Sequence, residues 1–144
     1  MPLAQKNPYN QYKQTEINTA NQGKLIVMLY DGAIKFLKVA LENMAVKTYD
    51  VVNTNIIKAQ DIITELLLSL NMKDGGEISS NLFNLYLYFK KRLLEANIQK
   101  SSEIIEETIT NMSLLRDSWN KISAKEAPTD NATVSKKGSF SIEG

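Results

Sequence analysis

The fold of this chain is decided by residues 52–70, which read VNTNIIKAQDIITELLLSL. Apolar residues recur here at steps of three and four, the spacing that places side chains along one face of an α-helix. A second apolar set falls on another face, where a helix that serves only a bundle core is polar. The first set comprises Val52, Ile56, Ala59, Ile63, Leu66 and Leu70, and the second comprises Ile57 and Leu68. The stretch therefore predicts a core helix with an additional apolar flank.

The sequence on both sides of this stretch also favours helix. Residues 24–123 contain no proline and are rich in Leu, Ala, Glu and Lys, which have high helix propensity. Breaks between helices are expected after residue 45, at 71–77 and at 97–102. Thr48 is the expected N-cap after the first break, and serines are expected to cap the helix after the third. Within the second break, Asp74 and Glu77 have the spacing of a capping box. We expect helices over about 22–45, 49–71, 77–97 and 102–124. Short connections between helices of similar length make them antiparallel neighbours, so the prediction is an all-α, antiparallel up-down four-helix bundle.

The two ends differ in composition from the middle of the chain. Residues 1–21 are polar and amide-rich, with the aromatic pair Tyr9 and Tyr12, and we expect them to form a flexible leader. Residues 125–144 turn to Thr, Asp, Asn, Ser, Lys and Gly, which is typical of a disordered tail. The expected organisation is a leader or gate segment at 1–21, a four-helix bundle at 22–124 and a tail at 125–144.

Composition excludes several classes of function. The 144 residues are 43% hydrophobic and 23% charged, as in an ordinary globular protein, with a formal net charge of +1 that gives no basic stripe for nucleic acid. Cysteine and histidine are both absent, which excludes thiolate chemistry, a histidine base and the Glu-x-x-His motif of di-iron bundles. The longest apolar run, residues 25–30, is too short to cross a bilayer, and no secretory signal opens the sequence. We expect a cytoplasmic protein that is not an enzyme and that needs no metal or cofactor.

The apolar flank recurs in the neighbouring helices. The predicted third helix places Ile78, Leu82, Leu85, Phe89, Leu93 and Ala96 on a core seam, and Phe83, Leu87 and Leu94 on nearly the opposite face. The first helix is apolar around most of its circumference, including Tyr30 and Ile34, whereas the fourth has one apolar side. Three explanations fit this surplus: a splayed bundle that uses the residues internally, a homodimer face, or a groove for a partner. Tyr9 and Tyr12 are either solvated or docked into an apolar groove of the same chain.

Several segments, taken together and in order, resemble the flagellin-specific export chaperones of the FliS family. The resemblance runs from about residue 9 to 122, and one departure is Asn21-Gln22, where the family is expected to have Ser-Pro. The segments are Tyr9 and Tyr12, LIVMLYDG at 25–32, NIIKA at 55–59, LNMKDGGE at 70–77, NLFNLY at 81–86, LEAN at 94–97 and LRDSW at 115–119.

The resemblance implies a cytoplasmic chaperone for the disordered C-terminal segment of flagellin. Such a protein prevents premature polymerisation and brings flagellin to the gate of the flagellar type III export apparatus, without inserting into the membrane, as a monomer or weak homodimer. The alternatives are a dimerising structural bundle without a flagellin partner and a metalloenzyme that uses carboxylate ligands. The helix angles and the leader aromatics give the expected partner-binding residues. Tyr9 and Tyr12 are expected to act as a gate, and Asn55 is expected to form a hydrogen bond to the peptide backbone. The full set is Tyr9, Tyr12, Tyr30, Ile34, Asn55, Ile57, Leu68, Phe83, Leu87 and Leu94.

Overall fold

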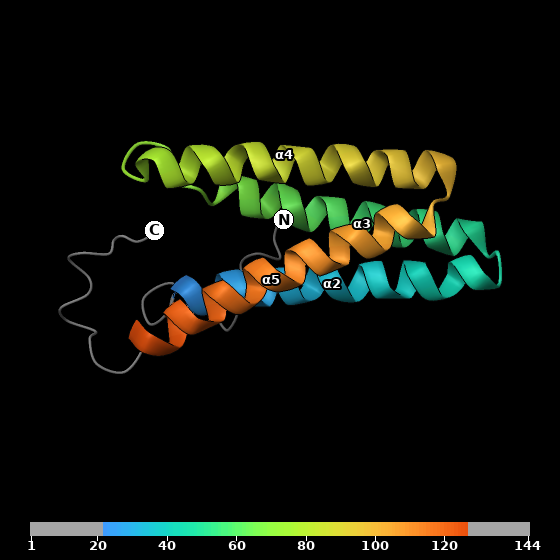
Figure 1. Cartoon of the computed structure of the whole chain (residues 1–144), viewed down its shortest axis with the longest axis horizontal. Helices are drawn as coiled ribbons and strands as arrows, with labels where there is room; N and C mark the ends of the chain where they lie inside the picture. The colour runs from blue at the N-terminus through green and yellow to red at the C-terminus, as the bar shows by residue number, and fades with distance from the viewer. Residues whose placement is uncertain (1–21, 127–144) are drawn as a thin grey trace, which may run out of the picture.

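The computed structural model describes residues 22–126, which form four α-helices and no strand (Figure 1). Helix α2 spans Gln22–Ala45, α3 spans Tyr49–Leu68, α4 spans Gly76–Gln99 and α5 spans Ser102–Glu126. The predicted four-helix bundle is confirmed, and the largest difference in a boundary is at the end of α3, which stops at Leu68 rather than near residue 71. The predicted leader, and all but the first two residues of the predicted tail, lie outside the described residues.

Helix α2 is the best-packed element of the bundle. It makes its most extensive contacts with α3 and α5, whereas α4 contacts α3 and α5 over smaller areas. Figure 1 shows the reason: α5 begins beside the end of α4 and then crosses toward α2, so that it diverges from α4 along its length. The first half of α4 is therefore left without the cover that a parallel-sided bundle would give it.

The core is built from one face of each helix, as the periodicity predicted. On α3 the predicted seam is confirmed, with Val52, Ile56, Ala59, Ile63 and Leu66 all buried and Leu70 packed against the core. On α4 the seam is confirmed from Leu82 onward, but its first member, Ile78, is 70% exposed. That part of the prediction is wrong, because Ile78 lies in the first turn of α4, where α5 has already diverged.

The predicted helix caps have different outcomes. Before α5, the prediction of a serine cap is confirmed, since Ser101 Oγ accepts a hydrogen bond from the Ile104 N–H at 3.2 Å. Before α3, Thr48 occupies the N-cap position, but its side chain makes no capping bond and its hydroxyl instead donates to Asn43 Oδ1 at 2.6 Å. The capping box of Asp74 and Glu77 is wrong: Gly75 is the N-cap of α4, and the Asp74 N–H donates to Asn71 Oδ1 at 2.9 Å.

Ion pairs on the surface connect α5 to both of its neighbours. Arg116 of α5 binds Asp31 of α2, with Nε 2.7 Å from Oδ1. Arg92 of α4 binds Glu107 of α5 at 3.0 Å and Glu95 of its own helix at 2.7 Å, and these hydrogen bonds raise the pKa of Arg92 above its ordinary value. None of the described helices combines the length and apolar character that crossing a membrane requires.

Candidate functional site

The apolar flank predicted for the second and third helices lies on the surface of α3 and α4. Ile57 and Leu68 on α3 and Leu87 and Leu94 on α4 are all exposed, between 43% for Ile57 and 73% for Leu68. Phe83 is half-buried. Contiguous exposed apolar surface is uncommon on a monomer that has no partner, so this face is the first candidate for a binding site.

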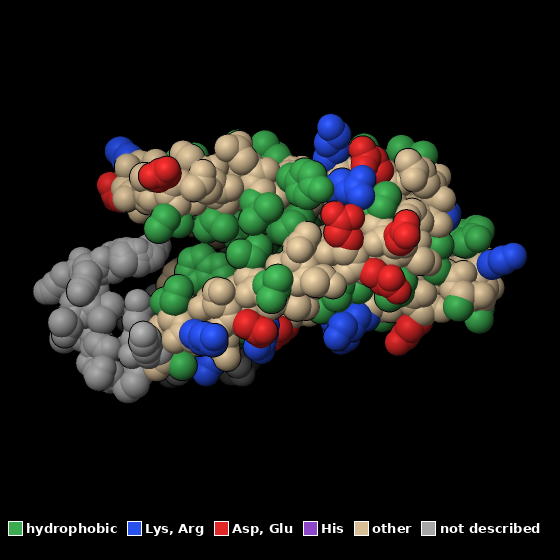
Figure 2. Space-filling model, in the orientation of Figure 1, with side chains coloured by type: hydrophobic (Ala, Val, Ile, Leu, Met, Phe, Trp, Pro, Cys, Tyr) green, Lys and Arg blue, Asp and Glu red, His purple; other side chains and the backbone are tan. Residues whose placement is uncertain are grey.

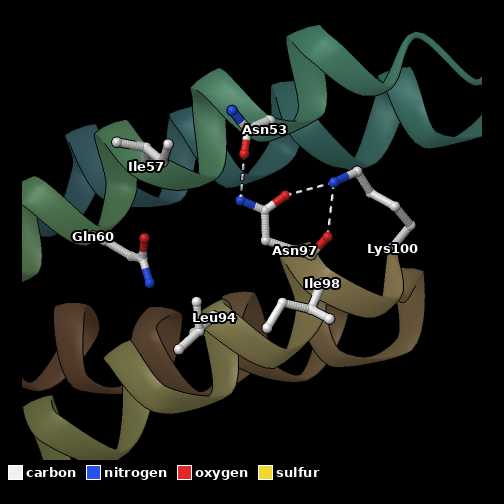
Figure 3. Close-up of a pocket in the computed structure, with 7 residues that line it drawn as sticks. All are labelled: Asn53, Ile57, Gln60, Leu94, Asn97, Ile98 and Lys100. Carbon is white, nitrogen blue, oxygen red and sulfur yellow. Dashed lines mark hydrogen bonds between the residues drawn. The ribbon is translucent and has the colours of Figure 1, made fainter.

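A pocket opens between α3 and α4 on this flank, with a volume of about 440 Å³ (Figure 3). Its apolar part is formed by Ile57 from α3 and by Leu94 and Ile98 from α4. The remaining lining is polar and consists of Asn53, Gln60, Asn97 and Lys100. An apolar pocket with a few polar groups at its edge is the usual form of a binding site for a ligand or a peptide side chain.

Hydrogen bonds fix the polar end of this pocket. The Asn97 Nδ2 donates to Asn53 Oδ1 at 2.7 Å, which joins α4 to α3 across the pocket. The Lys100 Nζ donates to both the backbone oxygen and the Oδ1 of Asn97, each at 2.7 Å. At the other side Gln60 Nε2 donates to the Lys90 carbonyl at 3.1 Å. These bonds hold the amide groups in place around the apolar part (Figure 3).

Three of the expected partner-binding residues lie elsewhere. Tyr30 and Ile34 are 0% and 8% exposed, so the expectation that they lie on an outer face is wrong. The physical reason is that α2 packs against both α3 and α5, so its wide apolar face is buried between these two helices. Asn55 is half-buried, and its Nδ2 donates to the Val51 carbonyl of its own helix at 2.9 Å. Tyr9 and Tyr12 lie outside the described residues.

The prediction from helix angles did not include the polar residues of the pocket. Asn53, Gln60, Asn97 and Lys100 carry no apolar periodicity, and two of them meet only because α3 and α4 pack side by side. A partial signal was present, since NIIKA at 55–59 contributes Ile57 and LEAN at 94–97 contributes Leu94 and Asn97. Two of the segments that carry the family resemblance thus meet at one pocket.

A second apolar surface lies between α4 and α5. Figure 2 shows apolar side chains gathered where these two helices diverge. Ile78 in the first turn of α4 and Ile122 in the last turns of α5 are both exposed. Helix α4 is therefore flanked by apolar surface on its α3 side and on its α5 side.

The lining of the α3–α4 pocket carries a positive charge and no negative one. Lys100 lines the pocket, and no acidic residue does. Lys90 lies next to it on α4, with Nζ donating to Thr64 Oγ1 at 2.6 Å. Within residues 22–126, no group of three or more His, Cys, Asp or Glu side chains is placed to hold a metal ion.

Comparison with known proteins identifies the relatives of this chain. Residues 5–126 match the model of a family described as flagellar protein FliS. The flagellar secretion chaperone FliS of Bacillus subtilis strain 168 is 36% identical over 119 residues, which cover 83% of this chain and 88% of that protein. The protein of the same name from Salmonella typhimurium strain LT2 is 36% identical over 115 residues, covering 78% and 84%. A crystal structure of a flagellar chaperone from bacteria has the same fold, with a TM-score of 0.69 at 20% identity over 83% of this chain and 100% of that one.

Proposed function

The chain belongs to the FliS family of flagellar secretion chaperones, and from this premise we propose that it binds the C-terminal segment of flagellin in the cytoplasm. Binding keeps that segment from polymerising before export and allows the complex to be delivered to the flagellar type III export apparatus. The observation that carries this proposal is the exposed apolar flank of α3 and α4, which the protein does not cover with its own described residues.

The energetics of such a surface suit the capture of an unfolded segment. Burying one side chain such as Leu or Ile is favourable by about 1.5–3 kcal/mol, whereas ordering a disordered partner has an entropic cost. A useful affinity therefore requires several apolar contacts along an extended surface. The flank of α3 and α4 offers such contacts at Ile57, Leu68, Leu87 and Leu94. The apolar surface between α4 and α5 extends this contact area.

We propose that the protein acts by binding and not by catalysis. The polar groups of the α3–α4 pocket are carboxamides and an ammonium group, which donate and accept hydrogen bonds but are poor bases and nucleophiles at neutral pH. Their arrangement suits the positioning of a peptide.

The leader tyrosines enter the proposal as a gate. Tyrosine combines a large apolar ring with a hydroxyl that tolerates a wet rim, so Tyr9 and Tyr12 are suited to cover an apolar groove and to yield to flagellin. This part of the proposal rests on the sequence, because both residues lie outside the described part of the chain.

Isothermal titration calorimetry of the full chain with a synthetic peptide of the flagellin C-terminal segment tests the proposal. We expect one peptide to bind per chain, with a negative heat-capacity change from apolar burial. Light scattering on the same samples distinguishes the alternative: a tight dimer that ignores the peptide would identify a dimerising structural bundle instead. A pull-down of the peptide complex on the cytoplasmic part of the export gate tests delivery.

A further inference from the structure

The polar end of the α3–α4 pocket holds more hydrogen-bond donors than the protein itself uses. An ammonium group has three N–H donors and a carboxamide has two. The Lys100 Nζ makes two hydrogen bonds, both to Asn97, and the Asn97 Nδ2 makes one, to Asn53. One N–H of Lys100 and one of Asn97 thus remain for a ligand at this end of the pocket, whereas the Asn53 nitrogen is turned away from them (Figure 3).

These donors surround a site that favours negative charge. Lys100 contributes a full positive charge, and the lining includes no carboxylate to neutralise it. The Lys100 Nζ also lies 6.0 Å from the centre of the Tyr49 ring, so its side chain is held between Tyr49 and Asn97. The aliphatic side chains of Ile57, Leu94 and Ile98 lie next to the donors (Figure 3). The combination of an apolar floor with a cationic, donor-rich end matches a ligand whose apolar side chain is adjacent to a carboxylate.

The position of the donors indicates where the ligand chain ends. Lys100 is the C-cap of α4, next to the connection from α4 to α5, whereas the apolar flank continues in the other direction along the two helices, toward Leu87 on α4 and Leu68 on α3. A segment that follows this flank and reaches Lys100 meets the donors with its last residue. Clustered N–H donors, usually those of the backbone, capture terminal carboxylates in other peptide-binding sites, and an ammonium donor makes such hydrogen bonds stronger.

We propose that the α3–α4 pocket binds the terminal α-carboxylate of the partner polypeptide. The last apolar side chain of the partner lies on Ile57, Leu94 and Ile98, and the carboxylate accepts hydrogen bonds from Asn97 Nδ2 and Lys100 Nζ. This inference rests on the proposed function, because it assigns the C-terminal end of the flagellin segment to one place and one direction along the flank.

The test compares two forms of one peptide. The full chain is titrated in the calorimeter with the flagellin C-terminal peptide as the free acid and as the C-terminal amide, which lacks the terminal charge and has an NH2 donor in place of one acceptor oxygen. Amidation is expected to weaken binding to the natural chain about tenfold, the loss typical of a charge-assisted hydrogen bond. With Lys100→Met the free acid should also bind about tenfold more weakly, and amidation should cause little further loss. Lys91→Met, which removes one charge from an exposed position of the same helix outside the pocket, is the matched control and should retain the full effect of amidation.

A second variant guards against a purely structural role for Lys100, whose Nζ also binds the last turn of α4. Asn97→Asp keeps an oxygen acceptor for Lys100 but places a carboxylate beside the ligand. It should weaken binding of the free acid more than binding of the amide, and the circular dichroism melting curve reports any stability lost with the hydrogen bond from Asn97 to Asn53.

The possible outcomes either support or overturn the site. Equal binding of both peptide forms to the natural chain would overturn it while leaving the proposed function intact. The same would follow if Lys100→Met weakened both forms by one factor, since Lys100 would then act only as a helix cap. If neither form bound at all, the proposed function would fail and the carboxylate site with it.

Discussion

Tyr30 and Tyr86 meet inside the bundle, with their hydroxyl oxygens 2.7 Å apart and their ring centres 6.3 Å apart. Tyr30 belongs to α2 and Tyr86 to α4, and these two helices otherwise make few direct contacts. Both side chains are almost completely buried. The pair therefore connects α4 to the well-packed side of the bundle through one buried polar contact.

Removing one hydroxyl of this pair should destabilise the protein. Tyr30→Phe leaves the buried hydroxyl of Tyr86 without its partner, and Tyr86→Phe does the same to the hydroxyl of Tyr30. An unsatisfied buried polar group costs about 1–3 kcal/mol, so each variant should lower the free energy of unfolding by about that amount. Urea denaturation measures both. Unchanged stability of either variant would contradict the buried contact, and the double variant should lose less than the sum of the single variants.

The same pair makes the protein sensitive to alkali. Burial raises the pKa of Tyr86 to about 12 and raises that of Tyr30 further above its ordinary value of 10. Above pH 10 the unfolded chain releases these protons while the native state retains them, so the native state becomes progressively less favoured as pH rises. The urea midpoint should be insensitive to the pair below pH 10 and should fall above it. In the Tyr30→Phe/Tyr86→Phe variant this alkaline fall should be shallower, although the variant starts from a lower stability.

The sequence was sufficient to predict which residues share a helix face, but not which neighbour covers each face. The α3 seam from Val52 to Leu66 was confirmed because its spacing is local to one helix. Tyr30 and Ile34 were predicted as partner contacts on a wide apolar arc, and that arc does not reveal that α2 contacts two helices along its length. Ile78 was predicted to be buried because it continues the spacing of the α4 seam. The divergence of α5 from α4 depends on how whole helices cross, which that spacing does not reveal.

The pocket illustrates the same limit for polar residues. Asn53 and Asn97 are 44 positions apart, and each alone resembles a solvated helix residue. Their contact depends on the relative position of α3 and α4 along their axes, which apolar periodicity does not determine. The apolar members Ile57 and Leu94 were accessible to prediction because each stands out on the side of its helix away from the core seam.

Substitutions at the two glycines where α4 begins should have different effects on stability. Gly76 has a φ of +57°, and a Cβ added there would meet nothing within 4 Å. Gly76→Ala should therefore cost only the strain of the left-handed backbone, about 1–2 kcal/mol, and Gly76→Asn should cost less. A Cβ at Gly75 would lie 2.5 Å from the Asn71 carbonyl oxygen and would overlap Ser79, so both Gly75→Ala and Gly75→Asn should be destabilising. Thermal unfolding of the four variants measures the contrast, and a rescue of Gly75 by asparagine would contradict it.

A charge on the apolar flank should abolish binding without unfolding the bundle. Leu87 is 45% exposed on α4, so Leu87→Asp buries little charge in the free protein but places a carboxylate against the bound peptide. Phe83→Asp, at a half-buried position, should act in the same direction. We expect peptide binding to be lost in calorimetry while the helical signal in circular dichroism holds. Leu114→Asp on α5, where the leucine is 64% exposed, is the matched control and should bind normally, whereas unchanged affinity of Leu87→Asp would remove the α3–α4 flank from the proposed site.

Removal of the leader should strengthen binding if Tyr9 and Tyr12 compete with flagellin for the groove. The apparent dissociation constant of a gated site equals the intrinsic constant divided by the fraction of molecules in which the site is open. A chain that starts at residue 22 lacks the competitor, so its affinity for the peptide should rise by the inverse of that fraction. Tyr9→Ala/Tyr12→Ala in the full chain should reproduce most of the gain, because the aromatic rings provide the apolar contact, whereas Asn7→Ala/Asn10→Ala should not. A loss of affinity on truncation would show instead that the leader contributes to holding the partner.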